Sequence, residues 1–267
     1  MATAHRSVEI KLNLRLSAQP DPSSSGAPVA AGRRDRFTAN NRLQMKIFLN
    51  NSWNRVWKGL EATGDEIAVY DELISRYSEP WRKYHTLRHL HECLTSFDSV
   101  AHLATRPAEV EAALWFHDAV YELHQPDNEG ASAQLATTIL SASGVASELC
   151  SRIAELIVLT KHNALPQAPD EQLLVDIDLA ILGASPSRFA EYERQIREEY
   201  SFVPEDVFRE KRGEILRSFV ARAHLYSTPH FRGLLEQQAR INLANSPKQN
   251  VSWCQNQSLQ IYPRSGV

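Results

Sequence analysis

The chain has 267 residues, of which 43% are hydrophobic, and this length and composition predict one core-forming domain with tails. A formal net charge of −3 argues against a general nucleic-acid-binding protein or a binder of anionic membranes, so any phosphate recognition is expected to be local. Three cysteines, Cys93, Cys150 and Cys254, lie far apart without CxxC spacing. This favours a reducing compartment and gives no support for a zinc ribbon or a disulfide framework. No apolar run approaches the roughly 18 residues of a membrane-spanning helix.

The two ends of the chain differ in composition from the rest. Residues 1–42 are rich in Pro, Ser and Arg and are predicted to be a disordered tail. The alternative is a transit peptide for organellar import, although Val8 to Leu16 alternate with polar residues as a strand does. A cytoplasmic location is expected otherwise. The segment from Ser246 to Val267 is predicted to be a loose C-terminal tail.

Between these tails, residues 43–245 show helical periodicity and no alternating strand series, which predicts an all-α domain. Proline and glycine residues support the predicted helix boundaries, because Pro107 suits the first turn of a helix and Gly144 and Gly183 suit C′ positions. After a first helix that includes Leu43 to Leu60, the predicted helices lie near residues 66–78, 84–101, 107–122, 128–143, 146–161, 172–183, 187–200, 204–226 and 231–245.

The pair His117-Asp118 places two metal-capable side chains in an otherwise apolar helical stretch, Ala113 to Tyr121. His117 lies on the apolar stripe of that helix and Asp118 on its flank, so both can reach one ion. A histidine or carboxylate buried without a partner is costly, and metal binding is one way of satisfying both. A structural histidine beside an ion-paired aspartate is the competing interpretation of such a short motif.

Further metal-capable residues lie on three other segments, and they favour the metal interpretation. His85 and His89 precede the pair, and His162, Asp176 and Asp178 follow it. The order along the chain is therefore His, then His-Asp, then His, then Asp.

This order resembles the HD superfamily of metal-dependent phosphohydrolases. The resemblance is carried by Tyr84-His85-x-x-x-His89, Trp115-Phe116-His117-Asp118-x-Val120-Tyr121, Asp127-Asn128-Glu129-x-x-Ser132-Ala133 and Asp176-x-Asp178-Leu179-x-Ile181-Leu182-Gly183, together with Arg197-x-Glu199-Tyr200 and Glu236-x-x-Ala239-Arg240-x-Asn242-Leu243. It spans about residues 45–245. It implies an HD-type helical bundle and metal binding through a His, the adjacent His-Asp and a late Asp, and it names no substrate.

The resemblance implies His85, His117, Asp118 and Asp178 as metal ligands. His85 is preferred because the first ligand of HD proteins often stands in a His-x-x-Arg setting; His89 is either a second-metal ligand or structural. Asp178 lies nearer the apolar stripe than Asp176, which is the alternative late ligand or a supporting residue. Asp118 is also expected to take part in catalysis by bridging a second ion, with His162 as a further ligand.

A shell of imidazoles and carboxylates suits Mn, Fe, Co or Ni, and also Mg, with one or two ions. Such an ion acidifies a water molecule and stabilises charge on phosphorus, so the expected reaction is hydrolysis of a small phosphorylated metabolite or nucleotide. The alternatives are a di-iron oxygenase of HD type and a catalytically silent nucleotide-binding module. The oligomeric state is left open.

Substrate contacts are predicted from cations and polar groups near the motifs. Arg88, Lys161 and His162 are the expected phosphate contacts, because the stem of Lys161 follows an apolar helical stripe. Lys161 and Glu129 are additional catalytic candidates, although Asn128-Glu129 also suits a helix-start network. The arginines of the later helices, Arg212 among them, are expected to form solvated faces.

Overall fold

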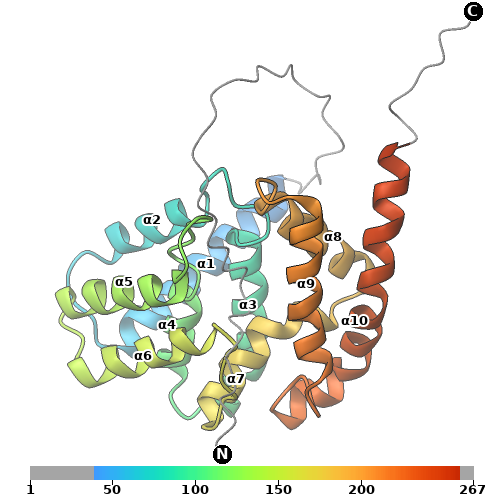
Figure 1. The fold of residues 1–267 in the computed structure, drawn as a ribbon. Coiled ribbons are helices and arrows are strands. Elements are labelled where there is room, and N and C mark those ends of the chain that lie inside the picture. Colours follow the sequence, from blue (N-terminus) through green and yellow to red (C-terminus); the bar gives the residue numbers. More distant parts are fainter. Residues whose placement is uncertain (1–38, 259–267) are drawn as a thin grey trace, which may run out of the picture.

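The protein is all-α, as the sequence predicts. The computed structural model describes residues 39–258, with side chains between residues 41 and 246, and every regular element in this range is helical (Figure 1). None of the helices described is long and apolar enough to cross a membrane. The elements are α1 (Ala39–Gly59), α2 (Glu66–Arg76), α3 (Leu87–Val100), η1 (Ala101–Leu103), α4 (Pro107–Phe116), α5 (Asn128–Ala142), α6 (Ser147–Leu159), α7 (Pro169–Asp178), η2 (Leu179–Gly183), α8 (Pro186–Glu199), α9 (Glu205–Val220) and α10 (Pro229–Ser258).

Several helix boundaries differ from those predicted. Residues 1–38 and 259–267, which make up most of the predicted tails, lie outside the described residues, whereas residues 39–42 belong to α1. α10 continues to Ser258, whereas a loose tail was predicted from Ser246 onward. The predicted helix 107–122 ends earlier, at Phe116.

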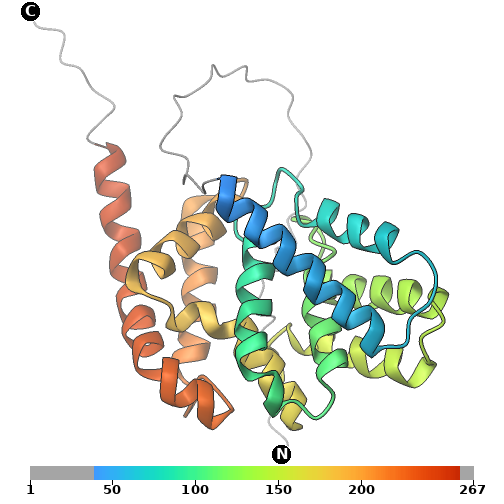
Figure 2. The same cartoon turned by 180° about the vertical axis from the view of Figure 1, so that it is seen from behind.

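Two groups of helices lie on either side of α3 and α7. Helices α1, α2, α4, α5 and α6 form one group, and α8, α9 and α10 form the other (Figures 1 and 2). α7 packs against both α3 and α4, and η2 joins it to the second group through α8 and α10. Residues at the ends of α4 and α7 and at the start of α3 therefore meet in the interior.

An aromatic cluster holds α1 against α4. The ring of Trp53 lies 5.3 Å from that of Trp115 and 6.1 Å from that of Phe116, and all three side chains are buried. The hydroxyl of Tyr77, just after α2, donates to the Trp115 carbonyl (3.1 Å) and accepts from the Asp118 backbone N–H (3.3 Å). Core packing is thus connected directly to the residues that follow α4.

The packing of α10 on η2 is close enough to require glycine at position 183. A Cβ placed on Gly183 would lie 2.6 Å from Leu235 Cβ and 2.9 Å from the Leu235 carbonyl oxygen. Asn242 fixes the same contact by donating to the carbonyls of Leu182 and Ala184, both at 2.8 Å. Because η2 begins directly after Asp178, this contact also positions the end of α7.

We expect Gly183→Ala to lower the free energy of unfolding by about 1–3 kcal/mol, since the new methyl group overpacks a backbone contact. The control is Gly233→Ala in α10, where an added Cβ has no atom within 4 Å. This variant should be as stable as the wild type or more stable. Urea denaturation of both variants measures the difference. Equal stabilities would contradict the packing argument.

Candidate metal centre

The predicted His-Asp pair lies at the end of a helix and not within one. His117 is the C-cap of α4, and its backbone N–H still bonds the Ala113 carbonyl (2.9 Å). The segment that follows is held by Arg82, whose buried guanidinium donates to the carbonyls of Asp118 (2.7 Å) and Ala119 (3.1 Å). A cation at this position also suits the negative end of the helix dipole.

α3 brings His89, and not His85, to this pair. The α3 N-cap is Thr86, whose hydroxyl accepts from the Arg88 N–H, so the helix starts at Leu87 and His85 precedes it. His85 therefore lies outside α3, although a helix was predicted over residues 84–101, and the two histidines do not share a helix face. His89 is in the first turn and points toward His117.

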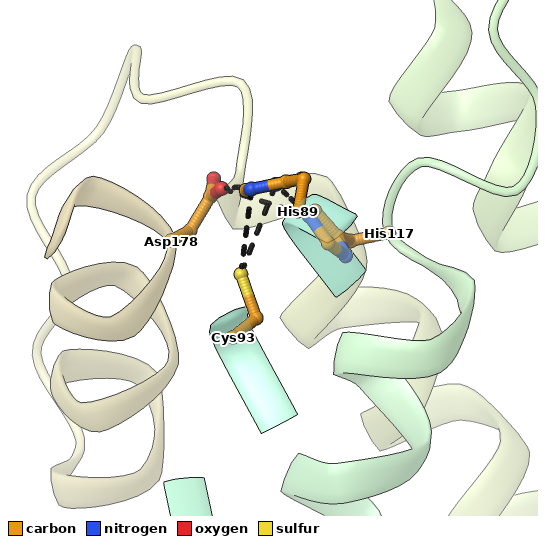
Figure 3. Close-up of side chains that lie close together, drawn as sticks. All are labelled: His89, Cys93, His117 and Asp178. Atoms are coloured by element: carbon orange, nitrogen blue, oxygen red, sulfur yellow. Dashed lines mark hydrogen bonds and ion pairs between the residues drawn. The ribbon is translucent and has the colours of Figure 1, made fainter. Parts of the chain in front are cut away.

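Four ring and carboxylate groups converge in the interior. His89 Nε2 lies 3.1 Å from His117 Nε2, 3.4 Å from Asp118 Oδ2 and 3.4 Å from Asp178 Oδ1. His117 Nε2 is 3.1 Å from Asp118 Oδ2 and 3.6 Å from Asp178 Oδ1. Ligand atoms of His89, Cys93, His117 and Asp178 all lie within 4.8 Å of one another, and this group can hold a metal ion (Figure 3).

Cys93 is a member of this group that the sequence analysis did not connect with metal. Its Sγ lies 3.7 Å from His89 Nδ1 and 3.8 Å from His89 Nε2, and the side chain is buried. The spacing of His89 and Cys93, i and i+4 on one helix, was the available signal.

The hydrogen bonds of His117 determine which of its ring atoms faces the cluster as an acceptor. His117 Nδ1 lies 2.8 Å from the Leu114 carbonyl oxygen. A carbonyl only accepts, so Nδ1 carries the proton, and in the neutral ring the lone pair is on Nε2. That lone pair is directed at His89 Nε2 and at the two carboxylates, as the ligand of a cation requires.

The charges of the cluster are strongly coupled. Burial lowers the pKa of His117, but Asp118 and Asp178 outweigh burial and raise it to about 10. Burial raises the pKa of Asp178, but hydrogen bonds from His117, His162 and His89 outweigh it and bring the pKa well below its ordinary value. Both shifts express one property, that positive charge is favoured between the two carboxylates.

Asp178 and Asp176 have separate roles. Asp178 reaches the cluster, whereas the buried Asp176 accepts from the backbone N–H groups of Ser227 and Thr228, both at 2.7 Å, and from the Thr228 hydroxyl. Asp176 therefore holds the segment that leads into α10. The preference for Asp178 over Asp176 agrees with this geometry.

His162 lies at the edge of the cluster, after α6. Its Nε2 is 2.9 Å from Asp178 Oδ2, the carboxylate oxygen on the far side from His89. The His162 backbone has φ of +55°, and buried Nδ1 has no hydrogen-bond partner among the described residues. Left-handed backbone at a residue other than glycine is uncommon and is found often at functional sites.

His85 lies beside the cluster in a separate hydrogen-bonded arrangement. Its Nδ1 is 2.8 Å from Glu199 Oε2, and its ring stacks on Tyr121 with centroids 4.1 Å apart. Glu199 Oε1 accepts three backbone N–H groups, from residues 83 to 85, at 2.7–3.1 Å. Burial raises the pKa of Glu199, but His85 and these N–H groups outweigh it and lower the pKa to about 2. Glu199 belongs to the motifs quoted above, although its role was not predicted.

A pocket opens onto the cluster and contains about 640 Å³ of empty space, part of it open solvent. Its polar lining includes His85, Asp118, His162, Asp178 and Arg212. Arg212, predicted to be on a solvated face, is buried in this wall, because Tyr192 and Glu193 of α8 bond its guanidinium.

The predicted phosphate contacts Arg88 and Lys161 do not line this pocket. Arg88 bonds Glu191 of α8 at 2.6 Å, and the ammonium of Lys161 pairs with Asp127 at 2.7 Å. Glu129, the other predicted catalytic residue, is buried in the first turn of α5 and is also not part of the lining. Helical periodicity alone does not distinguish positions such as these from positions that face the pocket.

Comparison of the chain with protein-family models, curated proteins and solved structures finds no match.

The ligand assignment can be tested by matched aspartate variants. Asp178→Ala should lose most of the bound metal and keep its helicity. Asp176→Ala should keep its metal and lose about 2–4 kcal/mol of stability, because three hydrogen-bond donors lose a buried, charged acceptor. Metal content by mass spectrometry and urea denaturation measure the two effects. Metal loss in Asp176→Ala with normal content in Asp178→Ala would reverse the assignment.

Proposed function

We propose that this protein is a metal-dependent hydrolase of phosphate esters or phosphoanhydrides, of HD type. The observation that carries the proposal is the convergence of His89, His117, Asp118 and Asp178, of which the two aspartates line a pocket. The order of these residues along the chain is the HD order, with His89 in the position first given to His85.

The spacing of the cluster supports a bound ion. Two ligand atoms about 2.1 Å from one ion and about 90–109° apart are separated by roughly 3.0–3.4 Å. The distances from His117 Nε2 to His89 Nε2 and Asp118 Oδ2 are both 3.1 Å, and His89 Nε2 lies 3.4 Å from each carboxylate. The distance from His117 Nε2 to Asp178 Oδ1, 3.6 Å, is slightly longer. The donor set therefore fits a divalent transition metal.

The identity of the ion depends on Cys93. Two imidazoles and two carboxylates suit Mn, Fe, Co, Ni or Mg, whereas a thiolate would favour zinc. We assign the ligands as the His and Asp residues, since Cys93 Sγ lies as close to His89 Nδ1 (3.7 Å) as to Nε2 (3.8 Å) and so does not single out the nitrogen that faces the cluster. Under this assignment Cys93→Ser retains the metal.

A divalent ion held by these residues would supply an acidified water as nucleophile and offset negative charge on the phosphate. The chain's own residues must then supply a proton to the leaving oxygen. We assign this role to His85, which lines the pocket: Glu199 Oε2 lies 2.8 Å from Nδ1, so Glu199 orients the ring and leaves Nε2 to act on the substrate. In this role His85 Nε2 would give its proton to the leaving oxygen as the phosphate–oxygen bond breaks.

A phosphatase assay with defined metals tests the function directly. Protein stripped by a chelator and reloaded with Mn, Fe, Co, Ni or Mg is assayed against phosphate monoesters, nucleotides and phosphoanhydrides. We expect phosphate release that disappears on stripping and returns on reloading. Absence of hydrolysis across the panel, or iron-dependent oxygen consumption, would contradict the proposal and favour the di-iron oxygenase.

His85 and His89 should give opposite phenotypes. His85→Gln should keep its metal and lose about 10²–10⁴-fold in kcat, the contribution expected of a general acid. The loss should be smallest for nitrophenyl phosphate, whose leaving group needs little protonation, and largest for alkyl phosphates. His89→Gln should lose the metal itself. An equal loss for all leaving groups would rule out the acid role of His85.

A further inference from the structure

The pocket that opens onto the cluster has an apolar body. Beyond the site's own polar groups, its walls are aromatic and aliphatic and come from η2, α8 and α9 and from tyrosines next to the helices. Tyr192 and Ile196 lie on α8, and Ile215 and Phe219 lie on α9; all four are buried. Such walls stabilise an apolar or aromatic group.

Within the described lining, Arg212 is the one Lys or Arg side chain. It is 6% exposed, and the Tyr192 hydroxyl (2.7 Å) and Glu193 hold Nη2, with Glu193 also contacting Nε (3.2 Å). The guanidinium carbon also lies 5.0 Å from the Tyr192 ring centroid. No described residue bonds Nη1, so its N–H groups remain available in a guanidinium whose orientation is already fixed.

The charges around the pocket limit how many phosphates it can hold. Asp118, Asp178 and Glu199 are negative, and Arg212 is already paired with Glu193. A divalent ion offsets two of these negative charges. A diphosphate or triphosphate would place several further negative charges beside a single cationic side chain, and like charges at short range are costly.

Resting on the proposed function, we propose that the substrate is a compact phosphomonoester with an aromatic or apolar alcohol part. Arg212 Nη1 binds its phosphate together with the metal centre, and the walls of α8 and α9 bind the alcohol part. Nucleoside di- and triphosphates are excluded as preferred substrates.

The test uses non-hydrolysable probes on metal-loaded, full-length protein. Calorimetry compares phenylphosphonate, inorganic phosphate and a nucleoside diphosphate analogue whose bridging oxygen is replaced by a methylene group. Burying the phenyl ring should make phenylphosphonate bind roughly 10- to 100-fold tighter than inorganic phosphate. A nucleoside diphosphate that binds as tightly as phenylphosphonate, or no preference for phenylphosphonate over phosphate, would overturn the inference.

Variants then separate the two halves of the pocket. Arg212→Met should weaken both phenylphosphonate and phosphate at least tenfold with unchanged metal content, whereas Arg209→Met, exposed on the same helix, should bind as wild type. Because Arg212 is buried, its replacement can also disturb the fold, so Ile181→Trp gives an independent test. Ile181 is half-buried and lines the pocket. A larger ring there should weaken the binding of phenylphosphonate but not that of phosphate. Unchanged phenylphosphonate binding in both variants would refute this mode of binding.

The outcome also distinguishes this inference from the function on which it rests. Metal-dependent hydrolysis of phosphate esters without a preference for phenylphosphonate overturns the substrate class and leaves the phosphohydrolase intact. Failure of phosphate, phenylphosphonate and hydrolysis together, in protein that holds its metal, overturns both.

Discussion

The 3.1 Å approach of His89 Nε2 to His117 Nε2, with a carboxylate oxygen close to each, is the constraint on which the site depends. The hydrogen bond from His117 Nδ1 to the Leu114 carbonyl leaves the Nε2 lone pair of the neutral His117 ring facing His89. His89 Nε2 therefore either donates a proton to that lone pair or shares a cation with it. The nearby carboxylates favour positive charge between the two rings, supplied by protons or by a cation.

Helix ends in the interior place these groups, and other side chains satisfy the backbone that such ends expose. Arg82 binds the carbonyls that follow α4, and Glu199 binds the N–H groups that precede α3. Both side chains are charged and buried, so each is stable only because the backbone groups it meets are numerous and well directed. The same two residues thereby fix the positions of Asp118 and His85. Arg82 and Glu199 therefore both stabilise the helix ends and position residues of the site.

The sequence predicted most helices, the His117-Asp118 pair and Asp178, because hydrophobic period and local motifs encode them. It preferred His85 to His89 as the first ligand, because the position of His89 depends on Thr86 acting as N-cap, which the spacing of the two histidines does not reveal. Arg88 and Lys161 were expected at the site because they lie near the motifs in the sequence, yet they bind Glu191 and Asp127. The role of Glu199 and the position of Arg212 arise from tertiary packing of α8 and α9, which the periodicity of a single helix does not encode.

Asp178 links the cluster of His89, His117 and Asp118 to the wall of the pocket. Its Oδ1 faces His89 and His117, and its Oδ2 bonds His162, whose carbonyl accepts from Arg222 (3.0 Å), just after α9. A left-handed residue such as His162 costs about 1–3 kcal/mol unless its surroundings hold it there. The bonds from Asp178 and Arg222 supply that restraint. Because α9 also carries Arg212, the position of the Arg212 guanidinium and the orientation of the Asp178 carboxylate are set by one connected group of contacts.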